Sequence, residues 1–327
     1  MKYLEIAGVK HPVSRIVSGT DQYSGWMEDK PLFDVLDAAR ELGINTIDSG
    51  REYAEGACER AIGRWLAKNN CREEMVLISK GAHHNEFRKR VTPYDITADL
   101  MDSLTFYGTD YIDIYLLHRD DESKDVGPIM ECLHEHRAAG RISVYGASNW
   151  SVARIKEANA YAKAHGLHPF EIISPHFSLG VQVGDPHGGG CISLTGEDMA
   201  ADRQWFADNG FSVFAYSSLC MGVFAGFVNR SNYKELYEQG KLPEPAFRTY
   251  CSDENFGRLE RAEQMAKEKG VTVAMIALAY VINYQTYYGL NTFALAGAAN
   301  REQVESGAAA ADLELTKAEV DWLYSGK

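Results

Sequence analysis

Short apolar runs rich in β-branched residues alternate along the chain with longer segments in which apolar residues recur every three or four positions. The short runs are typical of strands buried on both faces, and the longer segments are typical of amphipathic helices. The alternation continues from one end of the chain to the other. The candidate strands are 15–19, 44–48, 75–79, 111–118, 141–148, 170–177, 211–218 and 291–297.

The segment after the first candidate strand shows the helical pattern clearly. Leu32, Leu36, Ala39 and Leu42 form one apolar stripe, which is suited to cover a sheet. Gly43 follows directly and predicts a helix end, because glycine readily adopts the left-handed conformation of a C-cap. The same spacing recurs at Ile96, Leu100 and Leu104. Gly140 and Gly210 predict two further helix ends, each before a candidate strand.

Apolar strands separated by helices predict a parallel sheet with both faces covered. Two architectures fit that description. A doubly wound sheet that binds a dinucleotide would normally carry G-x-G-x-x-G after its first strand, and this sequence has no such motif. We therefore expect an α/β fold of the (β/α)8 barrel type, a single domain over residues 1–327. In such a barrel the active site lies at the C-terminal ends of the strands.

Three connections are longer than the others and predict long loops at that C-terminal face. They cover residues 20–30, 179–196 and about 219–253, and the second is rich in glycine. We expect these loops to shape a substrate pocket. The candidate substrate-binding residues in them are Tyr23, Trp26 and His187.

Composition narrows the class of protein. The 327-residue chain has a net charge of −13, which disfavours nucleic acid as a partner. Its six cysteines include no C-x-x-C pair, and free thiols in a reducing compartment are expected. No signal peptide is expected from the N-terminal sequence, and the apolar stretches 211–228 and 271–284 are interpreted as core. These features predict a cytoplasmic protein with no membrane partner.

Four polar residues follow or end the early strands, namely Asp48, Tyr53, Lys80 and His118. Residues at strand ends of a barrel are candidates for chemistry rather than for packing. A carboxylate, a phenol, an amine and an imidazole that converge form a proton-donating site. That chemistry suits the reduction of a carbonyl.

Four segments of the chain have a characteristic order and spacing, namely GINTIDSGREYAEG (43–56), LISKG (77–81), DYIDIYLLHRDD (110–121) and GASNW (146–150). They resemble the aldo-keto reductase family, and the resemblance covers almost the whole chain. It implies an NAD(P)H-dependent oxidoreductase that reduces an aldehyde or ketone, or catalyses the reverse, by direct hydride transfer. The resemblance also implies that Asp48, Tyr53, Lys80 and His118 are the family's catalytic tetrad.

The chemistry assigns a role to each member of this tetrad. Hydride delivery leaves negative charge on the carbonyl oxygen, so a group must protonate that oxygen, and Tyr53 is the candidate. A nearby Lys80 ammonium would lower the pKa of the Tyr53 phenol. Asp48 would supply the counter-charge that keeps Lys80 protonated. His118 would orient the carbonyl.

The resemblance also implies contacts with the cofactor. Ser148 and Asn149 match the residues that contact the carboxamide, and Tyr216 matches the aromatic residue on which the nicotinamide stacks. Backbone amides near the pyrophosphate would come from the segment after strand seven. The implied cofactor-binding residues are Gly19, Thr20, Asp48, Ser148, Asn149, Ser174, Tyr216, Ser217, Leu219, Gly222, Gly297, Ala298 and Gln303.

Two positions depart from the family pattern. Ser174 stands where the family usually has Gln, which predicts a shorter or water-mediated carboxamide contact. After strand eight, Gly297, Ala298 and Gln303 occupy positions where the family often supplies a cation for the adenosine 2′-phosphate, and Arg301 is the nearby cation. The family favours NADP(H), whereas the loss of cationic partners makes NAD(H) or dual use an alternative. Ser306 and Gly307 replace an acidic–amide pair.

The resemblance implies that the substrate is a small carbonyl compound or alcohol. The polar sequence from His118 to Asp121 favours a sugar-like or hydroxylated substrate, with a hydrophobic carbonyl as the alternative. No metal site is expected, because the histidines lack a zinc-like spacing. Two other functions stay open at this point, a nicotinamide-binding redox-sensing regulatory subunit and a metal-dependent hydrolase or isomerase.

Overall fold

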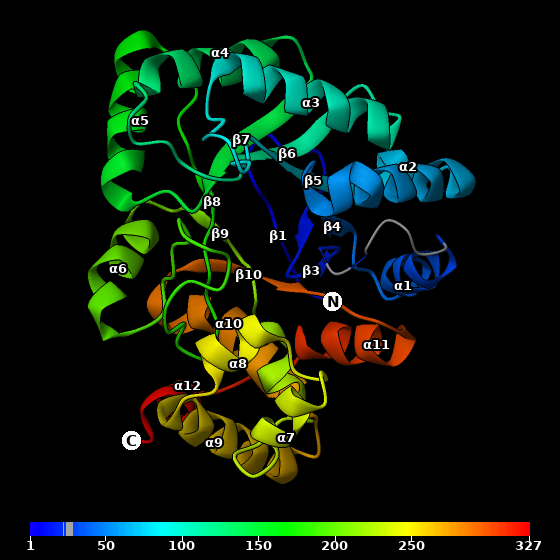
Figure 1. The fold of residues 1–327 in the computed structure, drawn as a ribbon, viewed down its shortest axis with the longest axis vertical. Helices are drawn as coiled ribbons and strands as arrows, with labels where there is room; N and C mark the ends of the chain where they lie inside the picture. The colour runs from blue at the N-terminus through cyan, green and yellow to red at the C-terminus, as the bar shows by residue number, and fades with distance from the viewer. Residues whose placement is uncertain (22, 24–28) are drawn as a thin grey trace.

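A computed structural model describes residues 1–21, 23 and 29–327, and it contains the predicted barrel. Eight parallel strands of the described residues close in the order β10-β3-β4-β5-β6-β7-β8-β9 (Figure 1). Each strand overlaps one of the predicted ranges. The bounds are β3 Ile16–Gly19, β4 Thr46–Asp48, β5 Val76–Gly81, β6 Ile112–Leu117, β7 Ile142–Ser148, β8 Ile172–Ser174, β9 Ser212–Ala215 and β10 Asn291–Ala296.

Helices follow the strands and pack around the barrel (Figure 1). The predicted stripes are confirmed within the helices, since Leu32 and Leu36 are buried on one helix and Ile96 and Leu100 on another. Leu42 lies just past the end of its helix and is half-buried. The helices are α1 Asp29–Glu41, α2 Ala57–Asn69, α3 Pro93–Tyr107, α4 Val126–Ala138, α5 Val152–His165, α6 Ala200–Asp208, α7 Tyr233–Glu238, α8 Glu244–Tyr250, α9 Asp253–Lys269, α10 Val273–Tyr288, α11 Arg301–Ala310 and α12 Lys317–Ser325.

The apolar core has two layers, as expected for strands buried on both faces. One layer lies between the strands and the surrounding helices and includes Trp65 and Tyr115. The other fills the barrel interior, where the rings of Phe214 and Phe293 stack with centroids 4.5 Å apart. This filled interior leaves the strand ends as the place for a site.

An N-terminal hairpin of β1 (Tyr3–Leu4) and β2 (Val13–Ser14) was not predicted from the sequence. Its strands pair antiparallel, and Val13 is fully buried in the barrel-interior cluster together with Ile6. Because β2 directly precedes β3, the hairpin covers the N-terminal end of the barrel. That arrangement leaves the opposite end open.

The long connection after β9 contains structure that the sequence analysis treated as a loop. A 3₁₀ segment, η4 (Cys220–Ala225), is followed by the short helices α7 and α8. Figure 1 shows these helices grouped with α9 at one end of the molecule, and α8 packs against η4. None of the helices in the described part of the chain is long and apolar enough to cross a membrane. The predicted core stretches 211–228 and 271–284 form β9, η4 and α10.

Candidate active site

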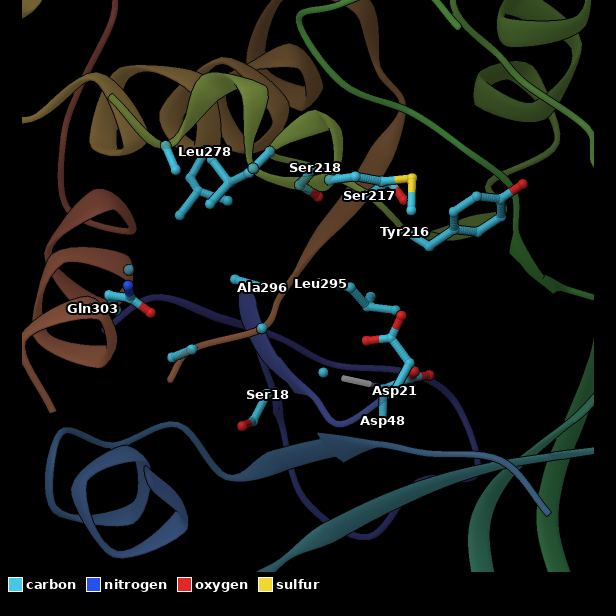
Figure 2. Close-up of a pocket in the computed structure, with 18 of the residues that line it drawn as sticks. Ser18, Asp21, Asp48, Tyr216, Ser217, Ser218, Leu278, Leu295, Ala296 and Gln303 are labelled. Atoms are coloured by element: carbon cyan, nitrogen blue, oxygen red, sulfur yellow. The ribbon is translucent and has the colours of Figure 1, made fainter. Parts of the chain in front are cut away.

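A cavity of about 950 Å³ lies at the C-terminal ends of the barrel strands. It extends from Asp48 and Tyr216 at one end to Gln303 on α11 at the other, with Ser217 and Leu278 along one wall (Figure 2). The volume is at the upper end of the range of about 300–1,000 Å³ that is usual for ligand sites. It is therefore large enough for an elongated ligand and a small second molecule.

Three of the four predicted catalytic residues form one hydrogen-bonded unit at the cavity. The Nζ atom of Lys80 lies 2.5 Å from Oδ1 of Asp48 and 3.1 Å from Oη of Tyr53, and it donates to both. A third donation goes to the carbonyl oxygen of Ser49 at 3.0 Å. Lys80 and Asp48 are each only 2% exposed, so this ion pair is shielded from water.

The chain folds locally so that Tyr53 faces Lys80. The loop after β4 is fastened to β5 by backbone bonds from Ser49 to the Ile78 carbonyl and from Arg51 to the Lys80 carbonyl. A tight turn then begins at Tyr53, where Ala54 and Glu55 adopt left-handed φ values of 47° and 55°. Lys80 itself lies within β5, rather than after the strand as the sequence predicted.

His118 completes the group from the end of β6. Its backbone NH donates to the Gly81 carbonyl at 2.8 Å, which fixes the residue against β5. Its ring meets the rings of Tyr53 and His83 edge-on, with centroid distances of 5.5 and 4.7 Å. The Nδ1 atom of this buried imidazole has no hydrogen-bond partner among the described residues. The structure thus brings the four predicted catalytic side chains together.

The protonation states follow from burial and from the neighbouring charges. Burial lowers the pKa of Lys80, but the charges of Asp48 and Tyr53 outweigh burial and raise that pKa above its usual value. Burial raises the pKa of Tyr53, and the Lys80 ammonium opposes this rise without overcoming it. Burial, with the charges of Lys80 and Arg119, holds the pKa of His118 well below its usual value. The site therefore holds an ammonium, a neutral phenol and a neutral imidazole.

Most of the predicted cofactor-binding residues line the cavity. Thr20 and Ser174 are the exceptions and are fully buried behind it. The Thr20 hydroxyl donates to the Asp48 carbonyl at 2.9 Å, and the Ser174 hydroxyl donates to the Phe214 carbonyl at 2.9 Å. The residues that do line it are Gly19, Asp48, Ser148, Asn149, Tyr216, Ser217, Leu219, Gly222, Gly297, Ala298 and Gln303.

Asn149 and Tyr216 are joined to each other and to the glycine-rich loop. The Tyr216 hydroxyl donates to Oδ1 of Asn149 at 2.9 Å, and that oxygen also accepts the backbone NH of Ile192 at 3.0 Å. The Ser148 hydroxyl donates to the Ser174 carbonyl at 2.6 Å. These contacts hold one wall of the cavity against residues 179–196.

The far end of the cavity is formed by residues 295–307 and the beginning of α11. Asn300 caps this helix by accepting the backbone NH of Gln303 at 3.0 Å, and Oε1 of Gln303 accepts the NH of Ala299 at 2.7 Å. Arg301 pairs instead with Glu41 and lines a separate, open hollow beside α1. No Lys or Arg among the described residues lines this end, whereas Glu302 does.

The three residues predicted to bind substrate lie in different places relative to the cavity or to the described part of the chain. His187 lines the cavity. Tyr23 is partly buried, and its hydroxyl donates to the Ala298 carbonyl at 2.5 Å. Trp26 lies outside the described residues. Further lining residues that the sequence analysis did not select include Asp21, Glu52, His83, Met221 and Phe227.

Glu59 is a buried polar residue close behind the site that sequence reasoning missed. It is fully buried on α2 and accepts a hydrogen bond from the Ser79 hydroxyl at 2.6 Å, next to Lys80 in sequence. Burial raises the pKa of Glu59 to about 7. A glutamate in the first turn of a helix is common at protein surfaces, so nothing in the sequence pattern marks this position.

The six cysteines all lie in the described residues, and none is joined in a disulfide. Among the residues that the structure describes, no three His, Cys, Asp or Glu side chains are grouped so as to hold a metal ion.

The closed barrel thus carries a buried Asp–Lys–Tyr unit and a neighbouring His at its C-terminal face, which is the arrangement expected from the sequence. The profile of the Aldo/keto reductase family matches residues 15–325, and the chain belongs to this family. It is therefore an NAD(P)-dependent oxidoreductase that acts on carbonyl or alcohol groups.

Two relatives agree with this assignment, and one solved structure shares the fold. The aldo-keto reductase YhdN of Bacillus subtilis is 25% identical over 296 residues, which are 86% of this chain and 82% of the relative. An aryl-alcohol dehydrogenase [NADP(+)] of Phanerodontia chrysosporium is 24% identical over 91% of this chain and 76% of its own length. The glycerol dehydrogenase AKR11B4 of Gluconobacter oxydans shares the fold, with a TM-score of 0.75, 22% identity and coverage of 99% and 96% of the two chains.

Proposed function

We propose that this enzyme interconverts an aldehyde or ketone and its alcohol by direct hydride transfer, with Tyr53 as the general acid and base. The observation that carries the proposal is the donation from Lys80 to both Asp48 and Tyr53 at the cavity. Because the ammonium donates to the phenolic oxygen, the phenolic proton is left to point elsewhere, including toward a carbonyl oxygen in the cavity.

The remaining residues support that proton transfer. In reduction, the carbonyl oxygen gains negative charge and takes the proton of Tyr53, and the Lys80 ammonium stabilises the phenolate that is left. Asp48 keeps Lys80 charged in a site shielded from water. His118 is neutral and has an imidazole N–H available to orient the carbonyl oxygen. The bound nicotinamide supplies or accepts the hydride.

The cavity fits a dinucleotide in size and in chemistry. Its residues would hold the cofactor in order, with Asn149 and Tyr216 near the nicotinamide and the backbone of 217–222 along the pyrophosphate. Ser217 and Met221 have φ values of 51° and 52°, and such left-handed turns can aim backbone NH groups at anionic oxygens. The beginning of α11 lies at the adenosine end. Thr20 and Ser174 would support these residues from behind.

We infer further that the enzyme prefers NAD(H) to NADP(H). A 2′-phosphate at the far end would find Gln303 in place of a cation, and the Glu302 carboxylate would oppose its charge. Arg301 does not compensate, because Glu41 and Glu305 both pair with it. The aryl-alcohol dehydrogenase of Phanerodontia chrysosporium carries NADP(+) in its name, so this preference would distinguish the two proteins.

The proposal is tested by following the absorbance of NADH and of NADPH in the presence of a panel of aldehydes, ketones and hydroxylated carbonyls. The expected result is carbonyl-dependent oxidation, faster with NADH at equal low concentrations. Failure of every carbonyl and every corresponding alcohol would overturn the proposed reaction. Faster use of NADPH would overturn only the cofactor preference.

A further inference from the structure

Arg119 is a buried cation at the substrate end of the cavity. It follows His118 directly, lines the cavity near Tyr53 and His187, and is only 6% exposed. One of its nitrogens, Nη1, donates to the carbonyl oxygen of His118 at 3.0 Å. A guanidinium has five N–H donors, so this single bond leaves most of its donor capacity unused.

No carboxylate of the described residues forms an ion pair with Arg119, although acidic residues are close in the sequence. Asp120 pairs with Arg154 at 3.3 Å. Asp121 accepts hydrogen bonds from the hydroxyl group and the backbone NH of Ser123. Glu52, which also lines the cavity, has Arg51 as its neighbour at 3.8 Å. The adjacent acids are therefore committed to other groups.

The charge of Arg119 acts on the groups around this part of the cavity. His83 and His187 both have lowered pKa values, first because of burial and then because of the nearby Arg119 charge. Both imidazoles are thereby kept neutral. Lys80 is the other cation lining the cavity among the described residues, and Asp48 already balances it. Asp21 also lines the cavity, and no ion pair joins it to Arg119.

The glycine-rich loop covers the stem of Arg119. Gly188, Gly189 and Gly190 all have left-handed φ values, and a Cβ built at Gly190 would lie 3.8 Å from Cδ of Arg119. Side chains at these three glycines would be strained in that backbone conformation. The loop thus lies close over the arginine and limits its contact with water.

We propose that Arg119 binds an oxyanion group, a carboxylate or a phosphate, on the carbonyl substrate. The planar fork of a guanidinium matches such a group, and an anion would satisfy the donors that the protein leaves free. This inference rests on the proposed function and narrows its substrate class to carbonyl compounds that carry a negative charge. The neutral His83 and His187 line the same region and can donate or accept further hydrogen bonds.

Binding of isosteric small ligands tests the inference without any turnover. Calorimetric titration would measure the dissociation constants of butyrate, butyramide and inorganic phosphate for the enzyme saturated with NADH. Butyrate or phosphate is expected to bind about ten-fold or more tightly than butyramide, as charge-assisted hydrogen bonds allow. In Arg119→Met the difference should disappear, and in Arg119→Lys it should shrink. Equal affinity of the wild type for all three ligands would overturn the inference, whichever variants fold.

Turnover provides the second readout. The ratio of kcat/KM for succinic semialdehyde or glyceraldehyde 3-phosphate to that for butanal should fall about ten-fold in Arg119→Met, mainly through KM. Lys89→Met removes an exposed positive charge on the same face but outside the cavity lining, and it should leave the ratio unchanged. If Arg119→Met lowers kcat/KM equally for charged and neutral substrates, Arg119 has a structural role and the inference is overturned.

These outcomes separate the two proposals. If butanal is reduced but oxyanions give no advantage in binding or turnover, the substrate class is wrong and the proposed reaction stands. If oxyanions bind through Arg119 but no carbonyl or alcohol is turned over, the proposed reaction fails and the anion site stands. The carboxylate and phosphate arms then identify which oxyanion the site prefers.

Discussion

The ammonium nitrogen of Lys80 lies 2.5 Å from a carboxylate oxygen of Asp48, and both side chains are almost completely buried. Two opposite charges in such a place stabilise each other, but each depends on its partner, because an unpaired buried charge is costly. The same nitrogen contacts Tyr53 at 3.1 Å. The ion pair therefore links the stability of the barrel rim to the chemistry of the phenol.

Removal of one partner is expected to destabilise the protein strongly. Asp48→Ala leaves the Lys80 ammonium without its counter-charge and should lower the free energy of unfolding by about 3–5 kcal/mol. The double variant Asp48→Ala with Lys80→Met removes both charges, and its free energy of unfolding should fall less than that of Asp48→Ala alone. Urea denaturation measures both values. A double variant that is less stable than Asp48→Ala would contradict this view of the pair.

Stability should fall at acidic pH because of His176. This residue is fully buried beside β8, with hydrogen bonds to Ser193 and Ser178, and burial lowers its pKa to about 3. Below about pH 6.5 the unfolded chain binds a proton at this position that the folded chain does not, so stability decreases as the pH falls. His176 should account for about 2 kcal/mol of the loss between about pH 7.5 and about pH 5.

Denaturant titrations of wild type and His176→Asn at the two pH values check this contribution. The variant is expected to be less stable than the wild type at neutral pH, because its hydrogen bonds are altered. Its free energy of unfolding should, however, decrease less on acidification. An equal loss in both proteins would show that His176 is not the group that takes up the proton on unfolding.

The strands, and the convergence of the four candidate catalytic residues, could be predicted from the sequence because both depend on local signals. Buried parallel strands appear as short β-branched runs, and Asp48 and His118 lie directly at their ends. Lys80 was placed one position beyond its strand, although β5 extends through it to Gly81. That error is small, because strand ends depend on pairing with β4 and β6, which a single strand's sequence does not encode.

Other features depend on contacts between distant residues and were missed. The strands of the N-terminal hairpin have two residues each, too few to show alternation. Glu59 looks like a surface glutamate until α2 places it beside Ser79. Arg301 was the only apparent cation for a phosphate, and its pairing with Glu41, 260 positions away, could not be predicted from the sequence.

Cofactor preference should respond to one charge at the adenosine end. Gln303→Arg places a cation on the cavity lining and is expected to tighten NADPH binding about ten-fold, with little change for NADH. Gln264→Arg, on the exposed face of α9, adds the same charge outside the cavity and serves as the matched control. Fluorescence titrations give the dissociation constants. Equal tightening by the two variants would show that overall charge, rather than position, controls the affinity.

Packing of α2 against α3 depends on the absence of a side chain at Gly63. A Cβ there would lie 2.3 Å from the carbonyl oxygen of Phe106, which is a backbone atom that cannot easily move. Gly63→Ala should therefore destabilise the protein by about 1–3 kcal/mol. Gly257→Ala, within α9, meets only the flexible Arg261 side chain at 3.6 Å and should stabilise by about 0.5–1 kcal/mol. Thermal unfolding compares the two, and a neutral Gly63→Ala would contradict the close helix contact.

The proton-transfer role of Tyr53 is tested most directly by removing its hydroxyl group alone. Tyr53→Phe should bind NADH as tightly as the wild type but reduce a carbonyl substrate about a hundred-fold to ten-thousand-fold more slowly, through kcat. Tyr94→Phe, at an exposed tyrosine on α3, is the matched control and should retain full activity. If Tyr53→Phe reduces the carbonyl at the wild-type rate, Tyr53 is not the proton donor.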